Sequence, residues 1–103
     1  MISKKPDDNL SFLYRAILML QTEEECRNFL QDLCTVSELK AMEQRMEVAM
    51  LLDDGLIYSD ILERTGASSA TISRVNRSLS YGTGAYERVF ARLKAGKAEE
   101  EAK

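Results

Sequence analysis

The sequence has no histidine, and its five glycines are scattered along the chain. Without histidine the chain lacks the most common general base, and glycines this far apart do not form a loop that cradles phosphate. Carboxylates are plentiful, but Glu23 to Glu25 lie at an expected helix start and Glu99 to Glu101 in an expected tail, so they do not meet in one catalytic site. These absences argue against an enzyme and against a metal site, and the sequence specifies no cofactor.

Long apolar runs are also missing. The longest uncharged ones, AILML at 16–20 and AMLL at 49–52, are far shorter than the roughly 20 apolar residues that cross a bilayer. The first residues, MISKKPDDNLS, lack the apolar segment and cleavage site of a secretory signal. We therefore expect no membrane association and a cytoplasmic location, where Cys26 and Cys34 stay reduced and pack as small buried hydrophobes.

The length and composition indicate a small folded domain that needs a partner. The chain has 103 residues, of which 45% are hydrophobic and 30% charged, as is typical of a globular protein. A core this small leaves much apolar surface uncovered, so we expect a homodimer. One all-helical domain is expected at 1–95, followed by a charged, flexible tail at 96–103.

Charge is unevenly distributed, although the formal net charge is only -3. From Arg64 to Arg92 the charged residues are five arginines and a single glutamate, Glu87. The N-terminal third instead carries a group of acidic residues: Asp7, Asp8, Glu23, Glu24 and Glu25. A basic region of this kind is a candidate for contact with nucleic acid despite the negative sum.

Apolar spacing predicts helices and no strands, beginning with two short helices. The first has Asp7, Asp8 or Asn9 as a cap and an apolar stripe of Leu10, Leu13, Tyr14, Ile17, Leu18 and Leu20. The second begins with Thr22 and Glu25 as a capping box. Its inward face is expected to be Cys26, Phe29, Leu30 and Leu33.

The third predicted helix is the longest. It begins with a capping box of Thr35 and Glu38 and ends before Gly55, which is expected to be left-handed. Its apolar face is expected to be Leu39, Met42, Met46, Ala49, Met50 and Leu52. The three methionines fit either a plastic ligand-binding wall or core and dimer packing, and methionine at helical spacing favours packing.

The next apolar patterns indicate two short helices, which together predict a helix-turn-helix at 58–79. The first covers 58–64, Gly66 forms the turn, and the second covers 68–79. Four apolar side chains are expected to face inward: Ile61, Leu62, Ile72 and Val75. After a loop at 80–85, a last amphipathic helix turns Tyr86, Val89, Phe90 and Leu93 inward and ends near Lys94.

The second helix of this motif has small and hydroxylated residues at its start, with Ser68 or Ser69 as its cap. At about 100° per residue, inward Ile72 and Val75 leave the opposite face free to approach DNA. The candidate DNA contacts are Ser68, Ser69, Ala70, Thr71, Ser73, Arg74 and Arg77. A plain helical hairpin with solvated arginines would give the same periodicity, but the glycine turn, the hydroxyl-rich start and the local positive charge together favour DNA binding.

The stretch TVSELKAMEQRMEVAMLLDDGLIYSDILERTGASSATISRVNRSL, residues 35–79, resembles the Trp repressor superfamily. Its GASSATISRVNRSL segment is most similar to the branch called YerC/YecD, a Trp repressor-like family of regulators. The resemblance implies an all-α fold and an intertwined dimer, in which the N-terminal helices and the last helix of two chains interlock. It also implies that the two helix-turn-helix motifs meet successive major grooves of DNA.

The resemblance further implies an effector site, at the positions that hold tryptophan in the Trp repressor. The matching residues here are Thr35, Arg45, Arg74 and Ser78. Val75 replaces a glycine of the Trp repressor, and its branched side chain would crowd the indole, which disfavours tryptophan as the co-repressor and leaves another small effector open. Arg74 then faces either DNA or that effector. Leu62 is a second departure, since the first helix of such motifs generally has a small residue there.

Together these patterns predict a sequence-specific, repressor-like DNA-binding transcriptional regulator that acts as a homodimer. The alternative is a helical protein-protein interaction adaptor without specific DNA binding. Exposed arginines on the second helix favour the regulator, since a protein-docking helix would more often present aromatic or aliphatic anchors.

Overall fold

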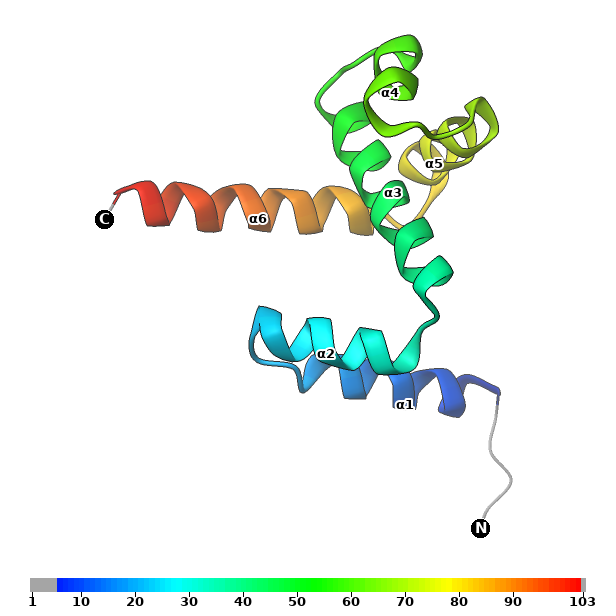
Figure 1. Cartoon of the computed structure of the whole chain (residues 1–103). Coiled ribbons are helices and arrows are strands. Elements are labelled where there is room, and N and C mark those ends of the chain that lie inside the picture. The colour runs from blue at the N-terminus through cyan, green and yellow to red at the C-terminus, as the bar shows by residue number, and fades with distance from the viewer. Residues whose placement is uncertain (1–5, 103) are drawn as a thin grey trace. The chain divides into compact units, whose positions relative to one another are not determined.

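The computed structural model describes residues 6–102, with side chains for residues 11–97. These residues form helices and no strand, as expected (Figure 1). The helices are α1 (Pro6–Leu18), α2 (Glu23–Leu33), α3 (Val36–Asp53), α4 (Tyr58–Thr65), α5 (Ser69–Tyr81) and α6 (Ala85–Ala102). The chain divides into two compact units, Met1–Leu39 and Lys40–Lys103. That residues 1–95 act as a single domain stays a prediction.

The first unit contains α1, α2 and the beginning of α3. Thr22 caps α2, because its hydroxyl accepts a hydrogen bond from the Glu25 N–H at 3.1 Å. The Glu25 carboxylate accepts a hydrogen bond from the Gln21 N–H at 2.9 Å, whereas in a capping box it would accept from the N–H of Thr22, one residue later. At α3 the box is complete: Thr35 N–H donates to Glu38 Oε1 at 2.8 Å, and Glu38 N–H donates to Thr35 Oγ1 at 3.1 Å.

The expected cap of α1 is wrong. The helix begins at Pro6, so Asp7, Asp8 and Asn9 lie within its first turn. Proline is well suited to the first helical position, where its missing N–H has no intrahelical partner to lose, and acids in the first turn complement the helix dipole. The helix ends at Leu18 in a tightened turn, with Met19 N–H bonded to the carbonyl of Ala16 at 3.1 Å.

The apolar side chains of the first unit are largely exposed. No residue of α2 is buried, and Leu33 of its expected inward face is exposed. On α1 the exposed large apolar side chains are Phe12, Tyr14, Ile17 and Leu18, followed by Met19 after the helix. Cys26 and Cys34 are free but only half-buried, which corrects their expected burial. One copy of the chain therefore leaves this unit without a closed core.

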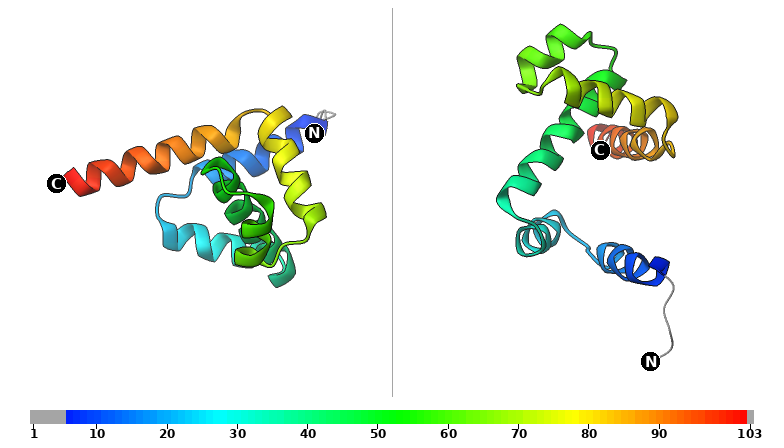
Figure 2. Two further views of the ribbon diagram at one scale, coloured as in Figure 1. Left: turned by 90° about the horizontal axis from the view of Figure 1, so that it is seen from above. Right: turned by 90° about the vertical axis from the view of Figure 1, so that its right-hand side faces the viewer.

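The core lies in the second unit. It consists of Val48 and Ala49 of α3, Ile61 of α4, Ala67 of the following turn, Ile72 and Val75 of α5, and Phe90 of α6. The half-buried Tyr86 stacks on Phe90 with ring centroids 5.9 Å apart. This cluster joins the four helices of the unit, and Figure 2 shows α4 and α5 crossing beside α3.

Several expected inward residues are exposed in this unit. Leu62 is 44% exposed, because it is turned about 100° around α4 from the fully buried Ile61. Val89 and Leu93 flank the buried Phe90 but face solvent. The three methionines of α3, Met42, Met46 and Met50, are also exposed, so the core of the single chain does not use them.

Glycines and polar contacts fix the ends of the helices here. Gly55 has φ +90° after α3 and Gly66 has φ +70° after α4, which confirms both as left-handed residues. At the end of α3, Lys94 Nζ forms ion pairs with Asp53 Oδ2 at 3.5 Å and with Asp54 Oδ1 at 3.6 Å. Beyond Lys94 the helix does not stop as expected but runs to Ala102, since alanine, glutamate and lysine are strong helix formers. Flexibility of 96–103 stays a prediction.

None of the helices within residues 6–102 combines the length and the apolar character needed to cross a membrane.

Candidate nucleic-acid interface

The reading head, residues 58–81, consists of α4, the turn at 66–68 and α5. It forms because Ile61 on α4 and Ile72 and Val75 on α5 are buried in the same core cluster. Gly66 ends α4 in the left-handed conformation, and its N–H bonds to the Leu62 carbonyl at 2.9 Å. The short, buried Ala67 then leads the chain into α5. This local structure is the helix-turn-helix that the sequence predicts.

Ser68, and not Ser69, caps α5. Its hydroxyl accepts a bond from the Thr71 N–H at 3.1 Å and donates to Thr71 Oγ1, also at 3.1 Å. Both hydroxyls are thus engaged in starting the helix. Ser69 lies next to this pair with an exposed side chain. The Ser69 hydroxyl is therefore exposed and takes no part in this capping pair.

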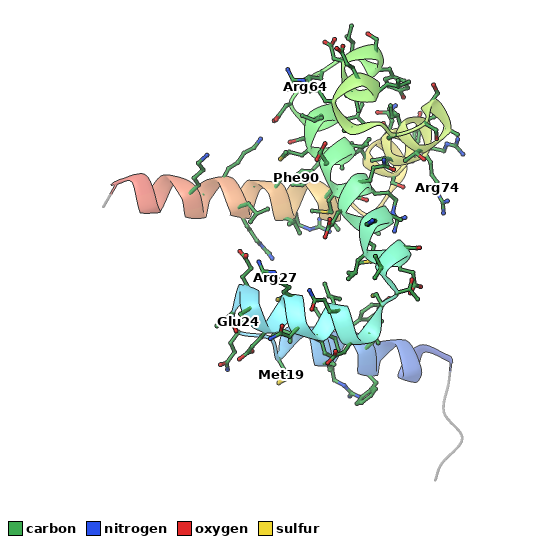
Figure 3. The ribbon with its side chains drawn as sticks, viewed as in Figure 1. Met19, Glu24, Arg27, Arg64, Arg74 and Phe90 are labelled. Carbon is green, nitrogen blue, oxygen red and sulfur yellow. The ribbon has the colours of Figure 1, made fainter. Side chains whose placement is uncertain are left out.

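The face of α5 opposite the core is exposed, as the 100° spacing predicts. Ala70, Arg74 and Arg77 face solvent, whereas Ser73 is half-buried at the edge of this face. Figure 3 shows Arg74 projecting away from the helices of its unit. The predicted contact residues thus form two groups. Ser69, Ala70, Arg74 and Arg77 face solvent, whereas Ser68 and Thr71 are hydrogen-bonded to each other and Ser73 is half-buried.

Tyr81 also lies on this face and was missed in the sequence. The helix runs two residues past the expected end at Leu79, which places Tyr81 four residues after Arg77 and on the same side. Its side chain is 86% exposed. The sequence does contain the periodicity of this face, a spacing of three and four residues through Ala70, Arg74, Arg77 and Tyr81. The glycines that follow, Gly82 and Gly84, favour a loop and led to an earlier predicted helix end.

The electrostatic character of α5 is positive. The helix has no acidic residue, and within the described side chains neither Arg74 nor Arg77 forms an ion pair. Arg88 at the start of α6 is instead held by the Thr83 carbonyl at 3.0 Å. The outer side of α4 carries mixed charge, with Asp60, Glu63 and Arg64. Two unpaired guanidinium groups on α5 are thus available to an anionic partner.

The residues expected around an effector are distributed over both units. Arg45, Arg74 and Ser78 belong to the second unit and are exposed. Thr35 belongs to the first unit, where its N–H and hydroxyl are bonded to Glu38. Val75 of α5 is only 2% exposed, so its side chain is part of the core. Within the part of the chain that is described, no cluster of three carboxylates or cysteines could hold a metal ion.

Known proteins are similar to this chain in sequence and in fold. A family model described as Trp repressor protein matches residues 8–94. The uncharacterized protein YerC of Bacillus subtilis (strain 168) is 45% identical over 102 residues, which are 99% of this chain and 98% of YerC.

Two crystal structures are similar as well. A TrpR-like protein from Eubacterium eligens ATCC 27750 has a TM-score of 0.82 and 49% identity, over 84% of this chain and 90% of that chain. A candidate Trp repressor from Staphylococcus aureus has a TM-score of 0.81 and 42% identity, over 89% of this chain and 96% of that chain. The expected all-α, Trp repressor-like fold is therefore confirmed.

Proposed function

The chain belongs to the Trp repressor family, and from this premise we propose that it is a sequence-specific DNA-binding transcriptional regulator of the repressor type and not an enzyme. The single observation that supports the proposal best is the outward face of α5, where Arg74 and Arg77 are exposed opposite the buried Ile72 and Val75. A helix held by its core on one side and basic on the other is suited to the major groove of DNA. We place this activity in the cytoplasm.

The groups on α5 suggest distinct roles on DNA. Arg74, nearer the helix start, is the candidate for a bidentate contact to guanine, and the Ala70 methyl suits apolar contact with a thymine methyl. Arg77 lies about one turn further along and is the candidate for a phosphate. The Ser69 hydroxyl and the Tyr81 hydroxyl can each donate to a phosphate oxygen, which sets the orientation of α5 but carries no sequence information.

We propose that two copies of the chain form the active regulator. The first unit supports this, since Leu18 is 76% exposed and the side chains of Phe12, Leu18 and Met19 surround an apolar hollow of about 480 Å³. Apolar surface of this kind is seldom left open in a stable protein. Sedimentation equilibrium at micromolar concentration should give twice the chain mass of 11.6 kDa. A folded monomer would contradict the dimer.

A small effector remains part of the proposal. Its proposed contacts are Thr35, Arg45, Arg74 and Ser78, and tryptophan is disfavoured because a branched side chain occupies position 75. If Arg74 binds the effector, it bridges that effector to DNA.

The competing function is a protein-protein adaptor, and α4 offers an observation in its favour. Ile57, Tyr58 and Leu62 are exposed on or next to this short helix, and exposed apolar and aromatic side chains are typical anchors of protein interfaces. Such a surface needs no DNA.

An electrophoretic mobility shift across a library of genomic fragments separates the two functions. A regulator should shift a small subset of fragments in the presence of excess unrelated DNA, and these fragments would share one operator. A folded dimer that shifts no fragment more strongly than unrelated DNA would contradict the regulator and favour the adaptor.

A further inference from the structure

We propose that Gln44 of α3 positions the reading head, through a hydrogen bond to the turn between α4 and α5. The Gln44 Nε2 atom donates to the backbone carbonyl of Thr65 at 3.3 Å, across 21 residues of sequence. Both residues are half-buried and belong to the same compact unit. A carbonyl only accepts, so the orientation of the Gln44 amide is fixed by this contact. The proposal rests on the proposed function, since its main readout is recognition of DNA.

The Thr65 carbonyl has no hydrogen-bond partner within α4. It is one of the last four carbonyls of that helix, which have no intrahelical N–H to accept from. The neighbouring polar groups are satisfied locally. The Thr65 hydroxyl donates to the Ile61 carbonyl at 2.7 Å and accepts from the Ala67 N–H at 3.1 Å, while the Gly66 N–H bonds to Leu62. Gln44 therefore supplies a contact that the turn does not make for itself.

The position of Gln44 on α3 makes this contact directional. Val48, four residues later and on the same side of the helix, is fully buried in the core with Ile61 and Ile72. Apolar burial is non-directional, so these side chains decide which face of each helix points inward but restrain its exact rotation less sharply than a hydrogen bond does. A hydrogen bond weakens steeply when its angle changes. Gln44 thus adds an orientational restraint at the edge of an apolar contact.

Orientation matters more for reading bases than for attracting DNA. Base contacts require side chains within a few tenths of an ångström of the correct position, whereas attraction to phosphates depends mainly on the number of charges. Without Gln44, Arg74 and Arg77 would keep their charge but lose part of their alignment. Specific binding should therefore fall while non-specific binding stays.

The test compares Gln44→Met with the wild-type protein on operator and scrambled duplexes over a salt series. Methionine keeps the length and the helix propensity of glutamine but has no N–H donor. We expect operator affinity to fall about three- to tenfold, with the affinity for scrambled DNA and the salt slope unchanged. Gln31→Met on α2, where the glutamine is exposed, is the matched control and should bind like wild type. An unchanged ratio of operator to scrambled affinity in Gln44→Met would overturn the proposal.

Amide hydrogen exchange provides a readout that does not depend on DNA. In Gln44→Met we expect the Gly66 and Ala67 amides to exchange faster than in wild type, relative to the Val75 amide within α5. A purely structural role would instead accelerate all core amides together, and that result would contradict a positioning role. Failure of both Gln44→Met and Gln44→Ala to fold would contradict it too. If wild type shows no operator preference, the proposed function fails, while the exchange measurement still tests Gln44.

Discussion

Ser68 and Thr71 are joined by two hydrogen bonds at the start of α5. The Thr71 N–H donates to Ser68 Oγ, and the Ser68 hydroxyl donates to Thr71 Oγ1, each at 3.1 Å. The pair satisfies one of the N–H groups that a helix start leaves without an intrahelical partner. Part of the hydroxyl-rich segment therefore starts α5, while the side chain of the adjacent Ser69 stays exposed.

Ser68→Ala should lower the free energy of unfolding by about 1 kcal/mol, because the cap of α5 is lost. The neighbouring Ser69→Ala removes an identical hydroxyl that makes no cap, so its effect should stay within about 0.5 kcal/mol. Urea denaturation of both variants measures this difference. Equal destabilisation by the two substitutions would show that Ser68 is not the cap.

The capping box of α3 should respond to pH. The Thr35 N–H donates to the Glu38 carboxylate and, together with a side-chain hydrogen bond from Thr35, lowers the pKa of that carboxyl from the usual 4.5. A lowered folded-state pKa gives stability that is complete above the unfolded value and is lost as pH falls through the folded value. We expect the Thr35 amide resonance to titrate below pH 4.5 and the start of α3 to fray there. Glu38→Gln should abolish this titration, and a midpoint at or above the usual value would contradict the contact.

The local features of the fold were predictable from the sequence. Thr22, Thr35, Gly55 and Gly66 were identified because caps and left-handed turns depend on chemistry within a few residues. The outward position of Arg74 and Arg77 followed from the inward position of Ile72 and Val75 on the same helix. In each case the residues that decide the local structure lie within about one helical turn of one another.

Features that depend on distant partners were not predictable. Adjacent Ile61 and Leu62 are equally apolar, and only the position of α5 decides that the first is buried and the second exposed. The methionines of α3 have core-like spacing but are exposed in one copy, because periodicity does not say which surface covers them. The contact between Gln44 and Thr65 spans 21 residues and leaves no periodic signal.

Tryptophan should not bind as a co-repressor. Val75 fills its place in the core with only 2% of its surface exposed, and the Trp repressor has glycine at the matching position. Isothermal titration calorimetry of the wild-type protein with tryptophan should give no saturable heat. Saturable binding at micromolar concentration would overturn the steric argument.

Tyr81→Phe should weaken binding to operator and scrambled duplexes alike, by about 0.5 to 1.5 kcal/mol, since one neutral hydrogen bond to a phosphate is lost. The salt slope should not change, because no charge is removed. Tyr14→Phe on α1 removes the hydroxyl of another exposed tyrosine, 57% against 86% for Tyr81, and should have no effect. Fluorescence anisotropy with labelled duplexes checks both variants, and wild-type affinity in Tyr81→Phe would exclude this contact.

The most direct test of the DNA-binding role is the affinity of Arg74→Ala and Arg77→Ala for operator and scrambled duplexes over a salt series. Both side chains are exposed and lie opposite Ile72 and Val75, so their truncation should leave the fold and the proposed dimer intact. Arg77→Ala should weaken binding to both duplexes and reduce the salt slope by about one. Arg74→Ala should cost about 1 to 3 kcal/mol on the operator and relax the preference at one base pair.

Arg27→Ala is the control for this measurement, since it removes the same charge from α2, where Arg27 is paired with Glu23 at 2.7 Å. It should bind both duplexes like wild type. We expect only the two α5 variants to lose operator affinity, with unchanged circular dichroism. Wild-type operator binding by both Arg74→Ala and Arg77→Ala would contradict it, because α5 would then not be the recognition helix.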